Sequence, residues 1–226
     1  MPAAARKKQK PATGADDRAN NDLRSRLLLA ALPDVAFDGW HPALLTDAAR
    51  RAGISEDDAE ALFPDGTRGL ALYLSTWADE EMRKRLAREK MDGLRVRDRV
   101  ARGVEIRLDI LAPWKQAVSS GLCYLGTPPG GVLLPTQVWR SADIIWQAAG
   151  DTATDYNRYT KRLLLSGVLS ATVLFWLGDD SPQHQDTRAF LARRIDEALK
   201  LGKTAGGAVD KIKRGIDQVT RRRKNA

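Results

Sequence analysis

The longest apolar run of the chain predicts the central helix of its fold. Leu163 to Leu177 is almost continuously apolar, broken only by Gly167 and three small hydroxyl side chains. Thr154 can cap the start of a helix that contains this run, and Gly178 can end it in a left-handed conformation. The run is 15 residues long, whereas a bilayer-spanning helix needs about 20. A helix that is apolar on every side must instead be surrounded by protein or line a cavity.

Two interpretations of this run stay open. It can be a core helix and nothing more, or it can also form a wall of a lipid-sized pocket. In the second case the apolar side chains of the pocket come from this run and from an aromatic-rich helix before it, and the candidate lipid-binding residues are Trp139, Trp146, Leu164, Val168, Ala171 and Phe175.

The rest of the pattern is helical as well. A 3.6-residue period runs from Leu23 to Val35 and is broken at Gly39, and amphipathic patterns cover residues 69–88 and 97–111. A further helix follows Ser181 and Pro182, which suit an N-cap and a first helical position, and it is expected to end at Gly202. Residues 126–135 have the composition of a loop. No segment alternates like a strand, so the predicted fold class is all-α.

Residues 44–63 predict a helix-turn-helix. Thr46 can cap a short helix that ends at Gly53, and Ser55 can cap a second one with Asp58 at the capping-box offset. With its flanking helices, this stretch looks like the N-terminal module of the TetR repressor fold. The second helix has no basic residue, and the whole stretch has two basic residues against five acidic ones. Because DNA phosphates select Lys and Arg, we expect the module to keep its shape without binding DNA.

The net charge of +8 lies entirely in the two ends of the chain. Residues 1–10 carry +4 and residues 201–226 carry +6, which leaves −2 for residues 11–200. This distribution favours a tail that contacts an anionic membrane surface or nucleic acid. The expected organisation is a disordered leader over 1–20, a helix-turn-helix-like module over 21–72, a helical lipid-binding and dimerisation core over 73–202, and a basic amphipathic helix over 203–226.

That last helix has the pattern of an interfacial membrane helix, with an apolar stripe opposite a basic face. Docking on the body of the protein and contact with nucleic acid are the alternatives, and membrane contact is favoured. The candidate membrane-binding residues are Val209, Lys211, Ile212, Lys213, Arg214, Ile216 and Val219.

The sequence offers no catalytic or metal-binding spacing. Its two histidines, His41 and His184, are far apart, and the single cysteine, Cys123, is interpreted as a small buried side chain. The glycines of residues 126–131 are not followed by the Lys and Ser or Thr of a phosphate-binding loop. We therefore expect a protein that is not an enzyme and uses no cofactor or metal.

The segments AGDTATDYNRYTKR (149–162) and WLGDDSP (176–182) resemble the ubiquinone-biosynthesis lipid-binding accessory family. Weaker similarity covers residues 30–72 and 107–113. Members of this family are TetR-fold proteins that assist the di-iron demethoxyubiquinone hydroxylase. The resemblance implies a homodimer, a pocket for an isoprenoid quinone or phospholipid, a C-terminal helix that meets an anionic membrane, and no enzymatic activity. It implies a location in the cytoplasm on the inner membrane of a bacterium, or in the mitochondrial matrix of a eukaryote.

The start of the central helix mixes aromatic and charged residues, as protein interfaces do. The family's surface for the hydroxylase carries over to these positions, and the candidate partner-binding residues are Asp155, Tyr156, Asn157, Tyr159, Lys161 and Arg162. Arg158 stands where the family usually has tryptophan, and Arg188 is a second replacement of an aromatic residue. Two other functions remain as alternatives: a TetR-type ligand-responsive repressor, and a helical scaffold with a basic tail and no ligand.

Overall fold

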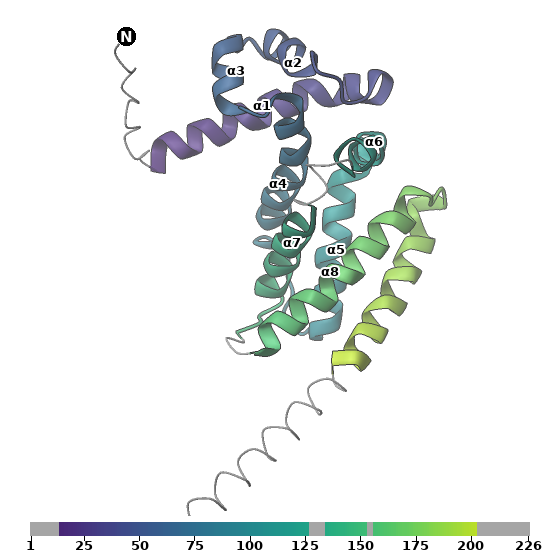
Figure 1. Cartoon of the computed structure of the whole chain (residues 1–226). Helices are drawn as coiled ribbons and strands as arrows, with labels where there is room; N and C mark the ends of the chain where they lie inside the picture. Colours follow the sequence, from purple (N-terminus) through teal and green to yellow (C-terminus); the bar gives the residue numbers. More distant parts are fainter. Residues whose placement is uncertain (1–13, 127–133, 153–155, 203–226) are drawn as a thin grey trace, which may run out of the picture. The chain divides into compact units, whose positions relative to one another are not determined.

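The computed structural model describes residues 14–126, 134–152 and 156–202. Within these ranges all regular structure is helical, which confirms the predicted all-α class (Figure 1). The chain divides into two compact units, Met1–Leu74 and Ser75–Ala226. The predicted membrane-binding residues of 203–226 lie outside the described residues, as do Thr154 and Asp155.

The first unit contains α1 (Gly14–Asp38), α2 (Leu44–Ala52) and α3 (Glu56–Leu62), together with the first part of α4 (Gly66–Leu86). Helix α1 begins at Gly14, inside the stretch that was expected to be disordered, and the chain leaves it at Gly39, whose φ is 69°. The helices are held together by fully buried leucines and alanines, among them Leu27, Leu28, Leu32, Leu44 and Ala48.

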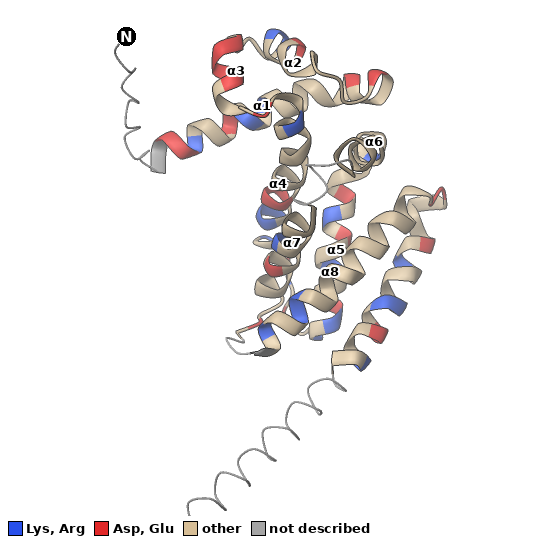
Figure 2. Ribbon diagram, in the orientation of Figure 1, with Lys and Arg blue, Asp and Glu red and all other residues tan. Residues whose placement is uncertain are grey.

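The helix-turn-helix has the predicted second cap but not the predicted first one. The Ser55 hydroxyl accepts a hydrogen bond from the Asp58 backbone N–H at 3.1 Å, and Gly53 ends α2 with a φ of 64°. Thr46 lies inside α2, so its predicted role as N-cap is wrong. The helix already begins at Leu44, whose N–H donates to the His41 carbonyl and whose side chain is fully buried. The first turn of α3 is acidic and exposed (Figure 2).

The second unit contains the rest of α4 and all later helices. In chain order these are α5 (Val96–Leu111), the 3₁₀ turn η1 (Ala112–Trp114), α6 (Lys115–Gly126), α7 (Leu134–Ala148), α8 (Tyr156–Leu177), the 3₁₀ turn η3 (Pro182–His184) and a helix over residues 185–202. Pro113 ends α5, as expected, since its ring cannot continue the helix.

Two features bring α4, α5 and α7 together in this unit. A Cβ added at Gly103 would lie 2.8 Å from Cγ2 of Ile145, so the missing side chain allows α5 and α7 to approach closely. The Asp79 carboxylate is 1% exposed and accepts hydrogen bonds from Arg107 Nε at 3.1 Å and Ser141 Oγ at 2.7 Å. Arg140 Nε, from α7, donates to its second oxygen. The buried charge is thus fully paired, as a low-dielectric interior requires.

Helix α8 has close to the expected bounds, but one chain alone leaves part of it exposed. Its segment Asn157–Leu177 has 21 residues and a mean hydropathy of 1.3, so by length and composition alone it could cross a membrane, a test that core helices also pass. Leu163 and Leu174 are 66% and 65% exposed, so a single chain does not enclose this helix on every side. Gly178 does not have a positive φ, because i,i+3 hydrogen bonds from its own N–H and that of Asp179 tighten the last turn instead.

Candidate functional site

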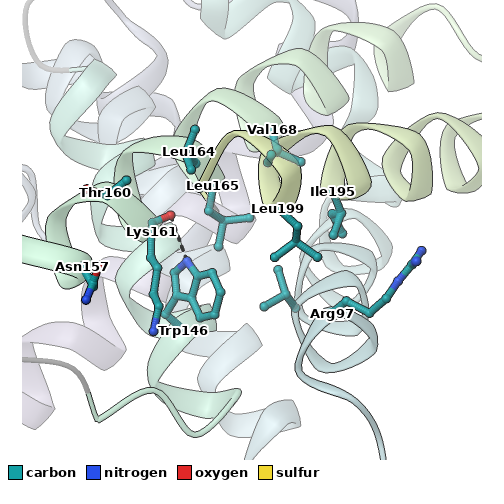
Figure 3. Close-up of a pocket in the computed structure, with 13 residues that line it drawn as sticks. Arg97, Trp146, Asn157, Thr160, Lys161, Leu164, Leu165, Val168, Ile195 and Leu199 are labelled. Carbon is teal, nitrogen blue, oxygen red and sulfur yellow. Dashed lines mark hydrogen bonds between the residues drawn. The ribbon is translucent and has the colours of Figure 1, made fainter. Parts of the chain in front are cut away.

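An apolar cavity of about 240 Å³ lies between α5, α7, α8 and the helix over 185–202 (Figure 3). The α8 residues that line the cavity recur at helical spacing, so one face of that helix forms a complete wall. The lining residues are Arg97, Val100, Trp146, Asn157, Thr160, Lys161, Leu164, Leu165, Val168, Ile195, Ala198, Leu199 and Gly202.

Three of the six candidate lipid-binding residues line this cavity: Trp146, Leu164 and Val168. The other three, Trp139, Ala171 and Phe175, do not. The Trp139 ring lies 6.3 Å from that of Tyr159, and the Phe175 ring stacks on Phe190 with 4.4 Å between centroids. The contribution of the last helix was missed, although Ile195 and Leu199 recur at i,i+4, because this spacing is also that of an ordinary core helix.

The polar residues of the cavity lie at its ends. Figure 3 shows Asn157, Thr160 and Lys161 on one side and Arg97 on the other, with the apolar side chains between them. Trp146 Nε1 donates to the Lys161 carbonyl at 3.0 Å, and Lys161 Nζ lies 5.4 Å from the centre of the Trp146 ring. The Lys161 ammonium also pairs with the Asp151 carboxylate at 2.6 Å. Lys161 therefore fixes both the indole that forms a wall and the polar end of the cavity.

A buried ion cluster lies beneath the start of α8. Arg162 is 2% exposed, and its guanidinium bonds Asp143 at 2.5 Å and Asp151 at 2.7 Å. Burial acts to lower the pKa of Arg162, but the hydrogen bonds that it donates to Asp151 and Asp143, together with their negative charges, outweigh burial and raise the pKa. The guanidinium stays charged and ties α8 to α7 and to the loop between them. Arg158, by contrast, is 45% exposed and lies 3.5 Å from Asp143.

The candidate partner-binding residues differ in their placement. Tyr159 is 62% exposed and Asn157 is also exposed, whereas Lys161 is half-buried. The side chain of Tyr156, like Asp155, lies outside the described part of the structure. Arg162 departs from the expectation of a direct contact, because its side chain is buried and supports this surface from beneath.

The WLGDDSP segment forms the start of the last helix. Asp179, rather than Ser181, provides the main cap: its carboxylate accepts from the N–H groups of Ser181 and Thr187 at 2.8 and 2.9 Å and from the Thr187 hydroxyl. Hydrogen bonds from Ser181 and Thr187 hold the pKa of Asp179 well below its ordinary value. The Ser181 hydroxyl accepts from the Asp186 N–H at 3.1 Å. The sequence pattern did not show that Asp179, and not the neighbouring Asp180, caps this helix.

The described ranges contain no group of three or more His, Cys, Asp or Glu that could hold a metal ion. Cys123 is exposed, which corrects the expectation of a buried side chain. Its exposure makes it a surface thiol.

The part of the chain that forms the cavity has known relatives. Residues 133–202 match the sequence profile of the COQ9 family. The mitochondrial ubiquinone biosynthesis protein COQ9 of Rattus norvegicus is 34% identical over 201 residues, which are 84% of this chain and 63% of that protein. The chain is homologous to the COQ9 proteins. COQ9 of Homo sapiens is 32% identical over 84% of this chain and 62% of its own length, so the chain spans about three-fifths of these COQ9 relatives.

A TetR transcriptional regulator from Nitrosomonas europaea has a similar structure. The TM-score is 0.64 at 22% sequence identity, over 79% of this chain and 98% of the regulator. This likeness confirms the predicted TetR-like fold for a COQ9 homologue, and at this identity it bears on the fold alone. The family profile covers α7, α8 and the last helix, which together supply most of the cavity lining.

Proposed function

We propose that this chain is a non-enzymatic accessory protein of ubiquinone biosynthesis that binds a lipid and presents it to an enzyme. The observation that carries the proposal is the overlap of two features in the first turns of α8. Asn157 and Lys161 line the apolar cavity and also belong to the predicted partner-binding surface. A ligand in the cavity is then adjacent to whatever docks on that surface.

The ligand is an isoprenoid quinone intermediate or a phospholipid. Removing each CH₂ group from water is favourable by about 0.8 kcal/mol, and the side chains between the two polar ends are apolar. The volume of about 240 Å³ is smaller than the roughly 300–1,000 Å³ of pockets that enclose a drug-sized ligand. The cavity therefore takes part of a long chain, and the remainder stays in the membrane.

The partner is the demethoxyubiquinone hydroxylase, docked on the start of α8. The exposed Tyr159 ring offers an aromatic anchor of the type that dominates interface energies. Arg158, beside it, adds a charge at the position where the family usually has tryptophan. The relatives' names support this pathway, and their mitochondrial location favours the matrix side of the inner membrane for a eukaryotic source.

A second copy of the chain covers the exposed face of α8. Leu163, Gly167, Ser170 and Leu174 are exposed at i, i+4, i+7 and i+11, which is one face of the helix. Only 33% of the apolar window of α8 is buried within one chain. A continuous apolar and small-residue face of this length is typical of a homodimer interface, and the TetR-like fold supports the same arrangement.

The test is a pocket-filling substitution. Lipid extracted from the purified full chain is measured by mass spectrometry for wild type, Ala198→Phe and Ala189→Phe. Ala198 lines the cavity, whereas Ala189 is exposed on the same helix and serves as the matched control. We expect lipid with wild type and Ala189→Phe and at least tenfold less with Ala198→Phe at unchanged helicity. If the wild-type protein carries no lipid, the proposed lipid-binding function is wrong, and the alternative of a helical scaffold without a ligand remains.

No observation favours the TetR-type repressor. The first turn of α3 carries Glu56, Asp57 and Asp58, all exposed, and contains no basic residue. These carboxylates repel DNA phosphates at the position where a recognition helix needs cations.

A further inference from the structure

One wall of the cavity is the helix over residues 185–202. Its cavity-facing positions recur every three to four residues, so they form a single face: Ile195, Ala198, Leu199 and Gly202. Figure 3 shows Ile195 and Leu199 across the cavity from Leu165 and Trp146. The two ends of this helix are held to the rest of the unit by contacts of different strength.

The first end is firmly anchored. The Asp179 carboxylate, which is 5% exposed, caps this end through Ser181 and Thr187, and the Asp179 carbonyl accepts from Lys115 Nζ at 2.7 Å. The Phe190 ring adds a stacked contact with Phe175, 4.4 Å away. Charge-assisted hydrogen bonds shielded from water are strong, so this end is a fixed point.

The second half of the helix, beside the buried Ile195, has an exposed ion pair to α5 as its polar tie. Arg97 Nη1 of α5 lies 2.6 Å from Asp196 Oδ1, and the two side chains are 33% and 44% exposed. Arg97 also lies 3.4 Å from Asp98 Oδ1, so a second carboxylate is available to it when Asp196 moves away. Because water competes for both groups, such a pair adds little net stability and opens readily. Gly202, still further along, lies close to Leu164, since a Cβ at this position would be 3.4 Å from Leu164 Cδ1.

We propose that the helix over 185–202 is a hinged wall of the cavity, which pivots near Asp179 and is latched by the Arg97–Asp196 ion pair. The ligand enters and leaves where this pair parts. The proposal rests on the lipid-binding function proposed above. It gives the cavity a side entrance, so that a long chain slides in laterally instead of threading through an end.

The first test compares two neighbouring ion pairs on the same helix. Asp196→Ala removes the latch, whereas Glu197→Ala removes the Arg194–Glu197 pair, which is of similar length (2.8 Å) but lies within the helix. Neither residue lines the cavity. Release of the fluorescent fatty acid cis-parinaric acid is followed by stopped flow. We expect Asp196→Ala to release the probe about two- to fivefold faster, the range set by an exposed pair, and Glu197→Ala to match wild type. Equal rates for the two variants overturn the latch.

The second test locks the wall. Arg97→Cys and Asp196→Cys are combined with Cys123→Ser, because Cys123 is an exposed thiol. The two cysteines are joined by a short bis-maleimide, and the same protein is compared before and after cross-linking. We expect release of the probe to slow at least tenfold in the cross-linked form. Unchanged release overturns the hinge alone, whereas a failure of every form to bind the probe overturns the lipid-binding function itself.

Discussion

Lys161 holds the indole of Trp146 by two separate groups: its carbonyl accepts the Nε1 hydrogen bond at 3.0 Å, and its ammonium lies 5.4 Å from the ring centre. The ammonium is in turn fixed by Asp151 at 2.6 Å. One residue of the predicted partner-binding surface thus sets the position of the aromatic wall of the cavity. A displacement of Lys161 by a docking protein would move the wall as well.

Replacing the indole tests this link. Trp146→Phe keeps an aromatic ring but removes the Nε1 donor, which leaves the Lys161 carbonyl with one partner fewer. We expect the free energy of unfolding to fall by about 1 kcal/mol and lipid affinity to weaken, as measured by urea denaturation and by probe titration. Trp139→Phe, outside the cavity, is the control and should leave lipid affinity unchanged. Equal effects of the two variants on affinity would contradict the role of Trp146.

The ion cluster beneath α8 predicts a large difference between neighbouring arginines. Arg162→Met removes one of the two cations that pair with the Asp151 carboxylate, whose side chain is 4% exposed, while Lys161 stays in place. Losing a hydrogen bond to a charged group costs about 1.5–3 kcal/mol, and the free energy of unfolding should fall by that amount because Lys161 still pairs with Asp151. Arg158→Met removes an exposed pair and should cost about 0–1 kcal/mol. Urea denaturation measures both, and similar losses would show that Arg162 is not the support of this surface.

The last helix should be sensitive to acid through Asp179. Its pKa is lowered in the folded state, so its contribution is fully present above the ordinary Asp value of about 3.9 and is lost as the pH falls toward the folded pKa. Asp179→Asn should therefore be less stable than wild type at neutral pH, with the gap narrowing below about pH 4. Asp180→Asn changes a fully exposed neighbour and should keep the wild-type profile. A gap for Asp179→Asn that does not change between pH 6 and pH 3 would contradict this assignment.

The exposed face of α8 predicts a dimer that dissociates when charged side chains are introduced into this face. Leu163→Glu combined with Leu174→Glu places carboxylates within the apolar face of the proposed interface. Sedimentation should then show a dissociation constant of the dimer that is at least tenfold higher. Phe37→Glu, at a residue that is 91% exposed in the first unit, is the control. A wild-type chain that is monomeric in solution would contradict the proposed interface.

The basic tail predicts membrane binding that depends on charge. Deletion of residues 203–226 should abolish co-sedimentation with vesicles that contain anionic lipid, because it removes both the apolar stripe and the excess of Lys and Arg. Raised salt should weaken the binding of the full chain. Unchanged pelleting of the shortened chain would exclude this role for the tail.

Features that depend on a few neighbouring residues could be predicted from the sequence. The Ser55 cap and the Gly53 turn are local, and both are confirmed. The all-α class and the TetR-like fold followed from helical periods and from motifs. Trp146, Leu164 and Val168 were found as cavity residues because they lie on the most apolar helix and the one before it.

Features that depend on which helix faces which could not be predicted. The burial of Arg162 arises only when α7 packs on α8 and brings Asp143 beneath it. Ile195 and Leu199 line the cavity only because the chain folds back after Asp179. The exposed face of α8 could not be recognised in the sequence. An apolar side chain that its own chain covers and one that remains exposed have the same composition.

The exposed guanidinium of Arg158, 3.5 Å from Asp143, has a consequence for how this chain and the proposed partner enzyme evolve together. A hydroxylase shaped to receive an indole would have to bury the Arg158 guanidinium here, whereas one with a carboxylate at that point would gain a salt bridge. The two proteins of one organism should therefore work as a matched set, and exchanging either for its counterpart from a species with tryptophan at this position should break the pairing.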